Sequence, residues 1–418
     1  MISPNFLRIV KWRMALMKFS HFTFISWESD TNRMVLKQNR YCIYNSCYLT
    51  LYMYAVGAIS LYHAFEYISP EPENGESDVF DVDYKPRDEA FSILSGLAHL
   101  MYALACMGWA GAMEIVLITR GGEFVDFMNL AISGNLKYQE VYKDHLGRDG
   151  YMRRSHNTTD MILLVTAIGS VIIPLIFVNV LFYEFCPEHQ IMLRYLEIKI
   201  MFEWKFLPMV VTGYYCILQV ADLVFIIVVM GMTYLNCYTN WLKLLTPTVV
   251  RINNGSAIFT CNLGCTMDEK QVIMVYKEQM VLQERFNNLV GNHYVTAHHS
   301  SFLYISAFGL FICIRNWRFI HEPGFLIAPI APVCCTLTEG VEVKFVEGAR
   351  KTSANYLKVV AKLAKKHRRQ LRGIPKYLKS CRPLQAQLAY PYYQLTPGNF
   401  LLFINSIVDT LVSLLVSF

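Results

Sequence analysis

The sequence predicts an all-α polytopic membrane protein with seven transmembrane helices, an inner N-terminus and an outer C-terminus. Three observations predict it: the composition, a set of long apolar segments, and the charge of the loops between them. Hydrophobic residues make up 54% of the 418-residue chain and charged residues 17%, with a mean hydropathy of +0.30. A water-soluble domain this apolar would aggregate, whereas a chain that crosses a bilayer repeatedly keeps such surface in lipid.

The apolar segments have the length that a membrane crossing needs, which is roughly 20 residues for a helix. They are residues 44–65, 90–118, 161–185, 206–235, 300–317, 324–343 and 400–418. The second and fourth are the strongest, and the fifth and sixth are shorter. The sixth contains Pro329 and Pro332, which membrane helices tolerate because neighbouring groups satisfy the freed carbonyls.

Loop charge predicts the orientation, because Lys and Arg concentrate on the cytosolic side of membranes. The N-terminal segment, residues 1–43, is basic, and the loop after the first apolar segment is acidic. The segment 350–382 contains basic residues and no acid. These charges predict a cytosolic N-terminus and an extracellular C-terminus, the reverse of a G-protein-coupled receptor.

Two loops, residues 119–160 and 236–299, fall on the cytosolic side by this count. Both contain a glycosylation sequon, at Asn157 and at Asn254. We expect both sequons to be unmodified, and glycosylation of either would contradict the predicted topology.

Two polar stretches have the periodicity of inner helices. Residues 267–297 place apolar side chains at helical spacing and are expected to continue into the fifth membrane helix, and residues 354–378 alternate apolar with basic residues. We expect them to form an intracellular helical bundle; the second could instead lie on anionic lipid. The predicted organisation is a cytosolic segment 1–43, membrane helices with inner extensions 44–345, a basic anchor segment 346–394 and a last helix 395–418.

The last helix has one polar face. Ser406, Asp409, Ser413 and Ser417 are spaced by three, four and four residues, which places them on one side of a helix. Copies of Asp409 around a symmetry axis would form an acidic ring that attracts cations. The alternative is that the serines bond to carbonyls of their own helix and Asp409 pairs with a neighbouring helix.

A second polar group lies in the middle of two other apolar segments. It consists of His99, Tyr102, Tyr215, Gln219 and Asp222. Aromatic walls with a few converging polar groups are typical of a small-molecule pocket. Hydrogen bonding between membrane helices is the alternative interpretation.

The remaining motifs do not indicate a metal site or a catalytic site. Cys261 and Cys265 are closely spaced, but no second pair of cysteines or histidines completes a zinc site. No paired catalytic carboxylates and no nucleophile motif stand out. We therefore expect no metal, no cofactor, no enzymatic activity and no nucleic-acid partner.

The C-terminal residues resemble the C-terminal motif of receptors in the insect chemoreceptor superfamily, which comprises the gustatory and odorant receptors. Gustatory receptors end in Thr-Tyr, five hydrophobic residues and Gln-Phe. Thr410 and Phe418 match this motif, Leu411 replaces its Tyr, and Ser417 replaces its Gln. Together with the predicted topology and the basic segment before the last helix, this resemblance indicates a divergent member, with gustatory or odorant type left open.

The resemblance implies a tetrameric, ligand-gated, non-selective cation channel in the plasma membrane of chemosensory neurons. The last helix would line the pore, with a gate at Val416, Ser417 and Phe418, and the inner helices would form an anchor domain. The implied partners are a small-molecule tastant or odorant, permeating cations, membrane lipid, and identical subunits or a co-receptor. A G-protein-coupled receptor and, less strongly, a secondary transporter are the alternatives.

Overall fold

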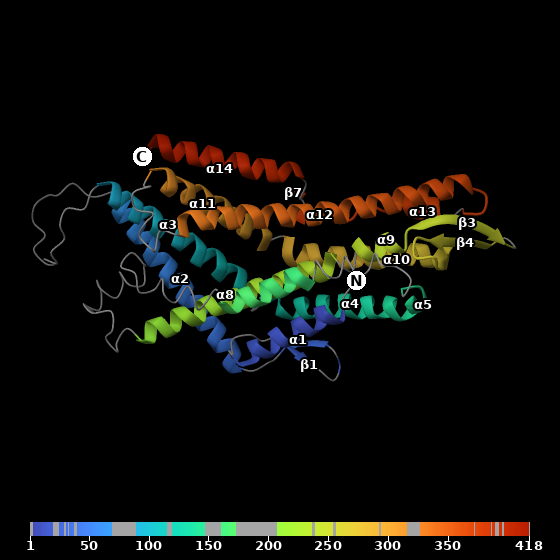
Figure 1. The fold of residues 1–418 in the computed structure, drawn as a ribbon, viewed down its shortest axis with the longest axis horizontal. Helices are drawn as coiled ribbons and strands as arrows, with labels where there is room; N and C mark the ends of the chain where they lie inside the picture. Colours follow the sequence, from blue (N-terminus) through green and yellow to red (C-terminus); the bar gives the residue numbers. More distant parts are fainter. Residues whose placement is uncertain are drawn as a thin grey trace, which may run out of the picture.

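The computed structural model is an elongated, mostly helical molecule (Figure 1). It describes residues 3–19, 25–28, 31, 33–36, 40–68, 89–114, 119–146, 160–172, 207–235, 239–253, 256–291, 294–315, 327–371, 373–385, 387–388, 393–394 and 397–417. The predominance of helix agrees with the prediction. The structure adds three small antiparallel sheets that the prediction did not include.

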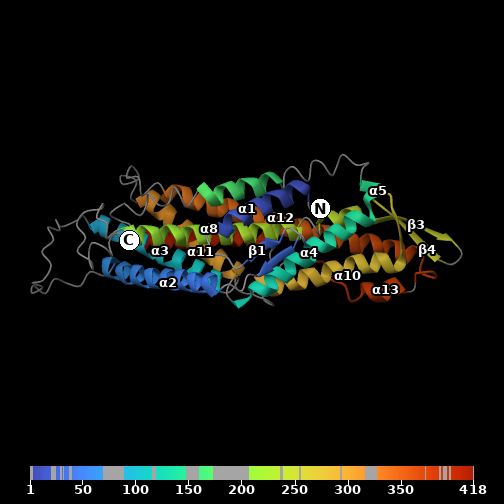
Figure 2. The same cartoon turned by 90° about the horizontal axis from the view of Figure 1, so that it is seen from below.

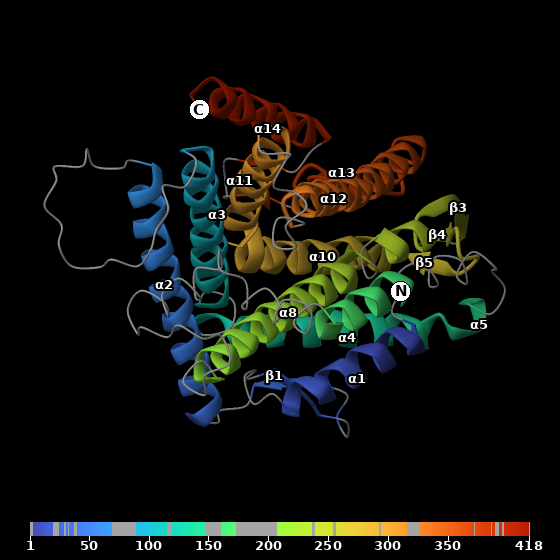
Figure 3. The ribbon, with the colours of Figure 1, turned by 60° about the vertical axis from the view of Figure 1, so that its left-hand side comes forward.

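Four helices lie at one end of the molecule (Figure 1), which we call the outer half after the orientation predicted from the loop charges. They are α2 (Arg40–Ile68), α3 (Glu89–Met113), α11 (Tyr294–Arg315) and α14 (Pro397–Ser417). Each contains one of the predicted apolar segments or most of it. Helices α2 and α3 lie side by side along most of their length (Figure 3).

Helix α8 (Leu207–Leu235) corresponds to the fourth predicted segment and runs obliquely toward the other end of the molecule (Figure 3). The third predicted segment is described only as the helix Asp160–Ile172, and its remainder lies outside the described residues. Among the described helices, Val210–Gly231 and Gly398–Ser417 are long and apolar enough to cross a membrane, and Asp160–Ile172 and His299–Arg315 are shorter apolar helices. The count of seven crossings stays a prediction.

Helix α12 (Ile327–Lys366) is 40 residues long and joins the outer half to the far end (Figure 1). It runs without a break through residue 345, where the sequence analysis placed a domain boundary. Pro332 lies inside the helix and packs on α11 at Gly309, where an added Cβ would lie 2.6 Å from the Pro332 ring and 2.7 Å from the Ala328 carbonyl oxygen. The absence of a side chain at Gly309 therefore leaves the space that the Pro332 ring occupies between α11 and α12.

The other end of the molecule, which we call the inner half, contains shorter helices. They are α1 (Pro4–Phe19), α4 (Gly121–Val141), α5 (Lys143–Leu146), α9 (Trp241–Leu244), α10 (Glu269–Phe286) and α13 (Gly373–Leu378). Asp268 begins α10 with a capping box: the Gln271 backbone N–H donates to Asp268 Oδ1 at 2.7 Å, and the Asp268 N–H donates to Gln271 Oε1 at 2.9 Å. A π-helical turn, η4 (Asn287–Gly291), follows, and α11 then departs from the direction of α10 (Figure 3).

The three sheets are small. Strands β1 (Ile25–Glu28) and β2 (Arg33–Leu36) form a hairpin near α1, and β6 (Gln387–Leu388) pairs with β7 (Tyr393–Gln394). The largest sheet has the order β3-β4-β5, from Pro247–Asn253, Ser256–Cys261 and Thr266–Asp268. It projects at the end opposite the C-terminus (Figure 2).

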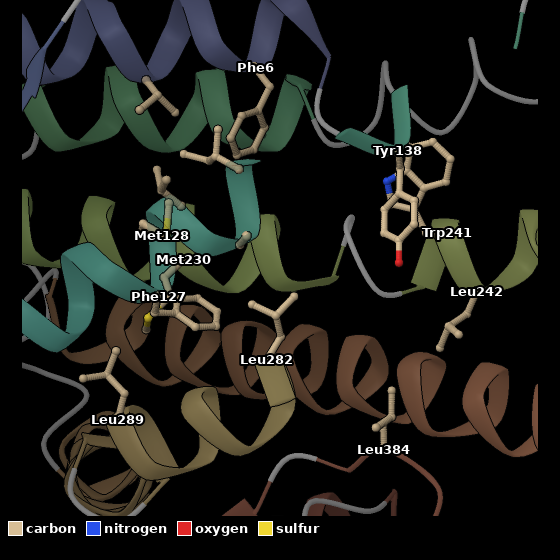
Figure 4. Packing of buried hydrophobic residues seen from close by; sticks show 14 of the residues in the cluster. Phe6, Phe127, Met128, Tyr138, Met230, Trp241, Leu242, Leu282, Leu289 and Leu384 are labelled. Carbon is tan, nitrogen blue, oxygen red and sulfur yellow. The ribbon is translucent and has the colours of Figure 1, made fainter. Parts of the chain in front are cut away.

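The largest hydrophobic core lies in the inner half, between α1, α4, α8, α10 and α12 (Figure 4). Within it the Tyr138 and Trp241 rings lie 5.1 Å apart, and Trp241 Nε1 donates to Asn135 Oδ1 at 2.9 Å. A buried indole whose N–H is satisfied contributes apolar area without an unpaired donor. This core holds the inner half together, and the intracellular location of these helices stays a prediction.

Candidate pore helix and ligand site

Helix α14 packs on the bundle through one face. Phe403 and Ile407 are buried against Ala307 of α11, and Leu411, Leu414 and Leu415 lie against the cluster of Leu97, Phe308 and Phe311. These residues recur every three or four positions, so the apolar contact follows one side of the helix. The contact fixes which side of α14 remains uncovered.

The uncovered side of α14 carries the predicted polar residues. Asp409, Ser413 and Ser417 are exposed, and Ser406 is half-buried at the edge of the face. Val416 is 82% exposed, and Phe418 lies outside the described residues. Other members of the face are apolar: Leu401, Leu402, Val408 and Val412 are also exposed. The face is therefore an apolar surface with a narrow polar stripe.

Within the stripe, the serine and the carboxylate behave differently. Ser413 Oγ donates to the Asp409 carbonyl oxygen at 2.8 Å, the back-bonding that membrane serines commonly make. No hydrogen bond or ion pair joins the Asp409 carboxylate to another described residue. The serine is thus satisfied within its own helix, while the carboxylate faces outward.

One histidine connects α14 to the two helices beside it. His299 of α11 lies with its Nδ1 2.8 Å from Glu339 Oε1 of α12, and its ring centroid is 4.9 Å from that of Phe403 of α14. Glu339 is buried, so the pair lies within the contact between α11, α12 and α14. Sequence reasoning did not select His299 or Glu339, because they are 40 positions apart and belong to different predicted helices.

The predicted ligand contacts lie on α3 and α8, which touch each other. On α8, Tyr215 is half-buried and Gln219 and Asp222 are fully buried. On α3, His99 is buried and Tyr102 is half-buried. The placement of all five inside the bundle is compatible with either interpretation, a pocket or contacts between helices.

Asp222 has a partner that the sequence analysis did not identify. Arg13 of α1 donates to Asp222 Oδ1, and its Nε donates to Ser170 Oγ at 2.8 Å. The side chains of Arg13 and Asp222 are 2% and 1% exposed. Arg13 was counted among the basic residues of the N-terminal segment. The sequence contains a pattern that could have indicated the burial of Arg13. Arg13 lies on an apolar face of α1 that is formed by Phe6, Val10, Met14 and Met17.

Gln219 lies one helical turn before Asp222 and is fully buried. Neither its Nε2 nor its Oε1 has a hydrogen-bond partner among the described residues. A buried amide without partners costs about 1–3 kcal/mol, so this position calls for a polar group that would satisfy it. Gln219 is therefore the first of the five predicted contacts to test by substitution.

His99 belongs to a small aromatic cluster in the outer half. Its ring lies 5.6 Å from that of His63 on α2, and His63 Nδ1 lies 3.1 Å from Glu66 Oε2. No group of three metal-ligating side chains occurs among the residues that the structure describes.

The sequence matches no known family profile, and no curated protein matches it. Among solved structures, the chain is similar to the insect olfactory receptor OR5 from Machilis hrabei in complex with eugenol. The identity is 11%, the alignment covers 98% of both chains, and the TM-score is 0.55. The chain therefore shares the fold of an insect olfactory receptor over nearly its whole length.

Proposed function

We propose that this chain is a subunit of a chemosensory receptor that acts as a ligand-gated, non-selective cation channel. The uncovered face of α14, with the outward carboxylate of Asp409, carries the proposal. An apolar helix with an unpaired acid is costly in lipid and is tolerated when the acid faces water. Several copies of α14 around an axis would place their carboxylates in one ring, which attracts cations.

The assembly that follows is a homotetramer, or a tetramer with a co-receptor, in the plasma membrane of a chemosensory neuron. Each subunit crosses the membrane seven times, with its N-terminus inside and its C-terminus outside. The inner half anchors the subunits to one another, and Val416, Ser417 and Phe418 form the outer gate. The fold shared with an insect olfactory receptor supports this arrangement. We expect no enzymatic activity.

The proposed ligand is a small, partly polar molecule bound between α3 and α8. Gln219 supplies the amide that lacks a partner among the described residues, and Tyr102, Tyr215 and His99 supply aromatic surface. Asp222 contributes a negative charge to the proposed site while it forms an ion pair with Arg13. Eugenol, which is bound in the similar receptor, combines an aromatic ring with a hydroxyl group and is the first probe to use.

The decisive experiment is Asp409→Asn in cells that express the receptor, recorded against a panel of small odorants and tastants that includes eugenol. The substitution keeps the size of the side chain and removes its charge. We expect lower conductance and lower permeability to divalent cations, with ligand sensitivity nearly unchanged, because α3 and α8 are untouched.

Glu114→Gln is the matched control, because Glu114 is an exposed acid at the end of α3 that accepts a hydrogen bond from the Tyr54 hydroxyl at 3.1 Å. Its charge lies on a different helix, so selectivity should not change. If Asp409→Asn conducts with the selectivity and block of the parent, Asp409 does not face the pore, and the observation that carries the proposal is lost.

Orientation has a separate test. An epitope tag after Phe418 should be labelled by antibody in cells that have not been permeabilised, and a tag before Met1 should not. A C-terminal tag that is labelled only after permeabilisation would reverse the proposed topology.

A further inference from the structure

Cys261 and Cys265 are brought together by the turn between β4 and β5. Their Sγ atoms lie 2.6 Å apart, and both residues are free thiols. This separation is well below ordinary contact between sulfur atoms and near the roughly 2.05 Å of a disulfide bond. The backbone therefore already holds both sulfurs at a position from which they can be joined.

Hydrogen bonds hold the turn in this shape. The Cys261 N–H donates to the Cys265 carbonyl at 3.0 Å, and the Gly264 N–H donates to the Cys261 carbonyl at 2.9 Å. Gly264 has a φ of +80°, a backbone conformation that is readily available to glycine. The next two amides donate outward, from Asn262 to the Thr246 carbonyl and from Leu263 to the Leu244 carbonyl, so the turn is fixed to the preceding chain.

The two thiols have different electrostatic surroundings. The hydrogen bond from Cys265, together with nearby backbone amides, lowers the pKa of Cys261 to about 7. The same hydrogen bond, together with burial, raises the pKa of Cys265. Near neutral pH a substantial fraction of the pairs therefore carries a Cys261 thiolate, which is the nucleophilic form, beside a protonated Cys265.

The pair lies under the surface of the β4–β5 turn. Cys261 and Cys265 are each 3% exposed, whereas Asn262, Gly264 and Thr266 around them are exposed. Only this turn therefore separates the two sulfurs from solvent. A thiolate with a second thiol in contact is the arrangement found in redox-sensing cysteine pairs.

We propose that Cys261 and Cys265 form a redox-active dithiol, which a peroxide oxidises to an intrachain disulfide. The Cys261 thiolate attacks one peroxide oxygen, the O–O bond breaks, and the departing hydroxide takes a proton to become water. Cys261 is then a sulfenic acid. The Cys265 sulfur attacks the Cys261 sulfur, the S–O bond breaks, and a second water leaves with the Cys265 proton. Two thiols are oxidised, one hydrogen peroxide is reduced to two waters, and an added dithiol reverses the change.

The test uses the full chain purified in detergent and fully reduced. It is treated with hydrogen peroxide, denatured in N-ethylmaleimide and digested, and the peptides are measured by mass spectrometry. We expect the peptide that contains both cysteines to lose two hydrogen atoms and to resist alkylation until a dithiol is added. The rate of disulfide formation should rise with pH through about 7.

Two single variants separate the roles of the cysteines. Cys265→Ser should leave a sulfenic acid on Cys261 that dimedone traps. Cys261→Ser should react with peroxide more slowly than Cys265→Ser, because backbone amides still lower the pKa of Cys261 in the second variant, whereas burial still raises the pKa of Cys265 in the first.

Cys381, a half-buried thiol outside the predicted membrane segments, serves as the internal standard, and the peroxide concentration is raised until Cys381 is oxidised. If Cys261 and Cys265 are both recovered as maleimide adducts at that concentration, the proposal is wrong. Equal reactivity of the two single variants would also overturn it. The first outcome is read on the unmodified protein and does not depend on how well a variant folds.

Discussion

Helices α8 and α14 have similar hydropathy but differ in how much of each is buried inside the chain. The segments Val210–Gly231 of α8 and Gly398–Ser417 of α14 have the same mean hydropathy, yet 56% of the first is buried inside the chain and 11% of the second. Each contains an aspartate. Asp222 is buried and paired with Arg13, while Asp409 is exposed. Hydropathy therefore does not distinguish a helix that completes the core of its own chain from one at the edge.

The difference shows what the acid does in each helix. A buried acid with a cationic partner fixes how two helices meet, and removing one partner leaves an uncompensated charge. An acid on an uncovered face has no such structural task. In the proposed channel, α8 therefore belongs to the fixed scaffold and α14 presents its acid to the permeation path.

The largest expected effect compares the two aspartates directly. Asp222→Asn should lower the free energy of unfolding by about 3–5 kcal/mol, because it leaves the buried Arg13 uncompensated. Asp409→Asn should change it by less than about 0.5 kcal/mol, as is usual for exposed positions. Thermal unfolding of each purified variant in the same detergent measures both.

The double variant Arg13→Met with Asp222→Leu is the control for the first comparison. Replacing a buried ion pair by apolar side chains of similar size is often neutral, so this variant should recover most of the lost stability. Equal losses in Asp222→Asn and Asp409→Asn would remove the distinction between the two helices.

The second prediction compares the buried side-chain amide of Gln219 on α8 with the exposed side-chain amide of Asn405 on α14. Gln219→Met should raise the stability of the chain by about 1–3 kcal/mol, because it removes a buried amide that has no partner among the described residues. The same substitution should weaken the response to ligand if Gln219 contacts it. Paired measurements of unfolding and of the dose–response curve test this expectation.

Asn405→Met on α14 is the matched variant, because Asn405 is an amide on the exposed face. Its stability and ligand response should both stay close to those of the parent. A loss of stability in Gln219→Met would show that its amide is hydrogen-bonded in the native protein, and a structural role would then replace the proposed ligand contact.

The smallest expected effect lies within α14 itself. Ile407→Val should lower the stability by about 0.5–1.5 kcal/mol, because it removes a methyl group from a packed position. Val416→Ala should cost less than about 0.5 kcal/mol, because Val416 is 82% exposed. If the two variants lose the same stability in thermal unfolding, the face that carries Val416 is covered in the assembled protein.

Several features of the fold could be predicted from the sequence, and α14 is the best case. Its polar stripe follows from helical spacing alone, and the structure places Asp409, Ser413 and Ser417 on one exposed face. The sheet β3-β4-β5 was not predicted, because its strands are short and lie within a segment read as a polar inner loop. The break in direction at η4 was missed as well, since the apolar periodicity continues across it.

The sequence by itself determined the mostly helical class and the polar face of α14, because these depend on spacings within one helix. Only the tertiary structure decided which partner each polar group meets. Arg13 and Asp222 are 209 positions apart, and His299 reaches α12 and α14 together. Local periodicity shows which face of a helix is polar, whereas a contact between distant segments depends on how the whole chain packs.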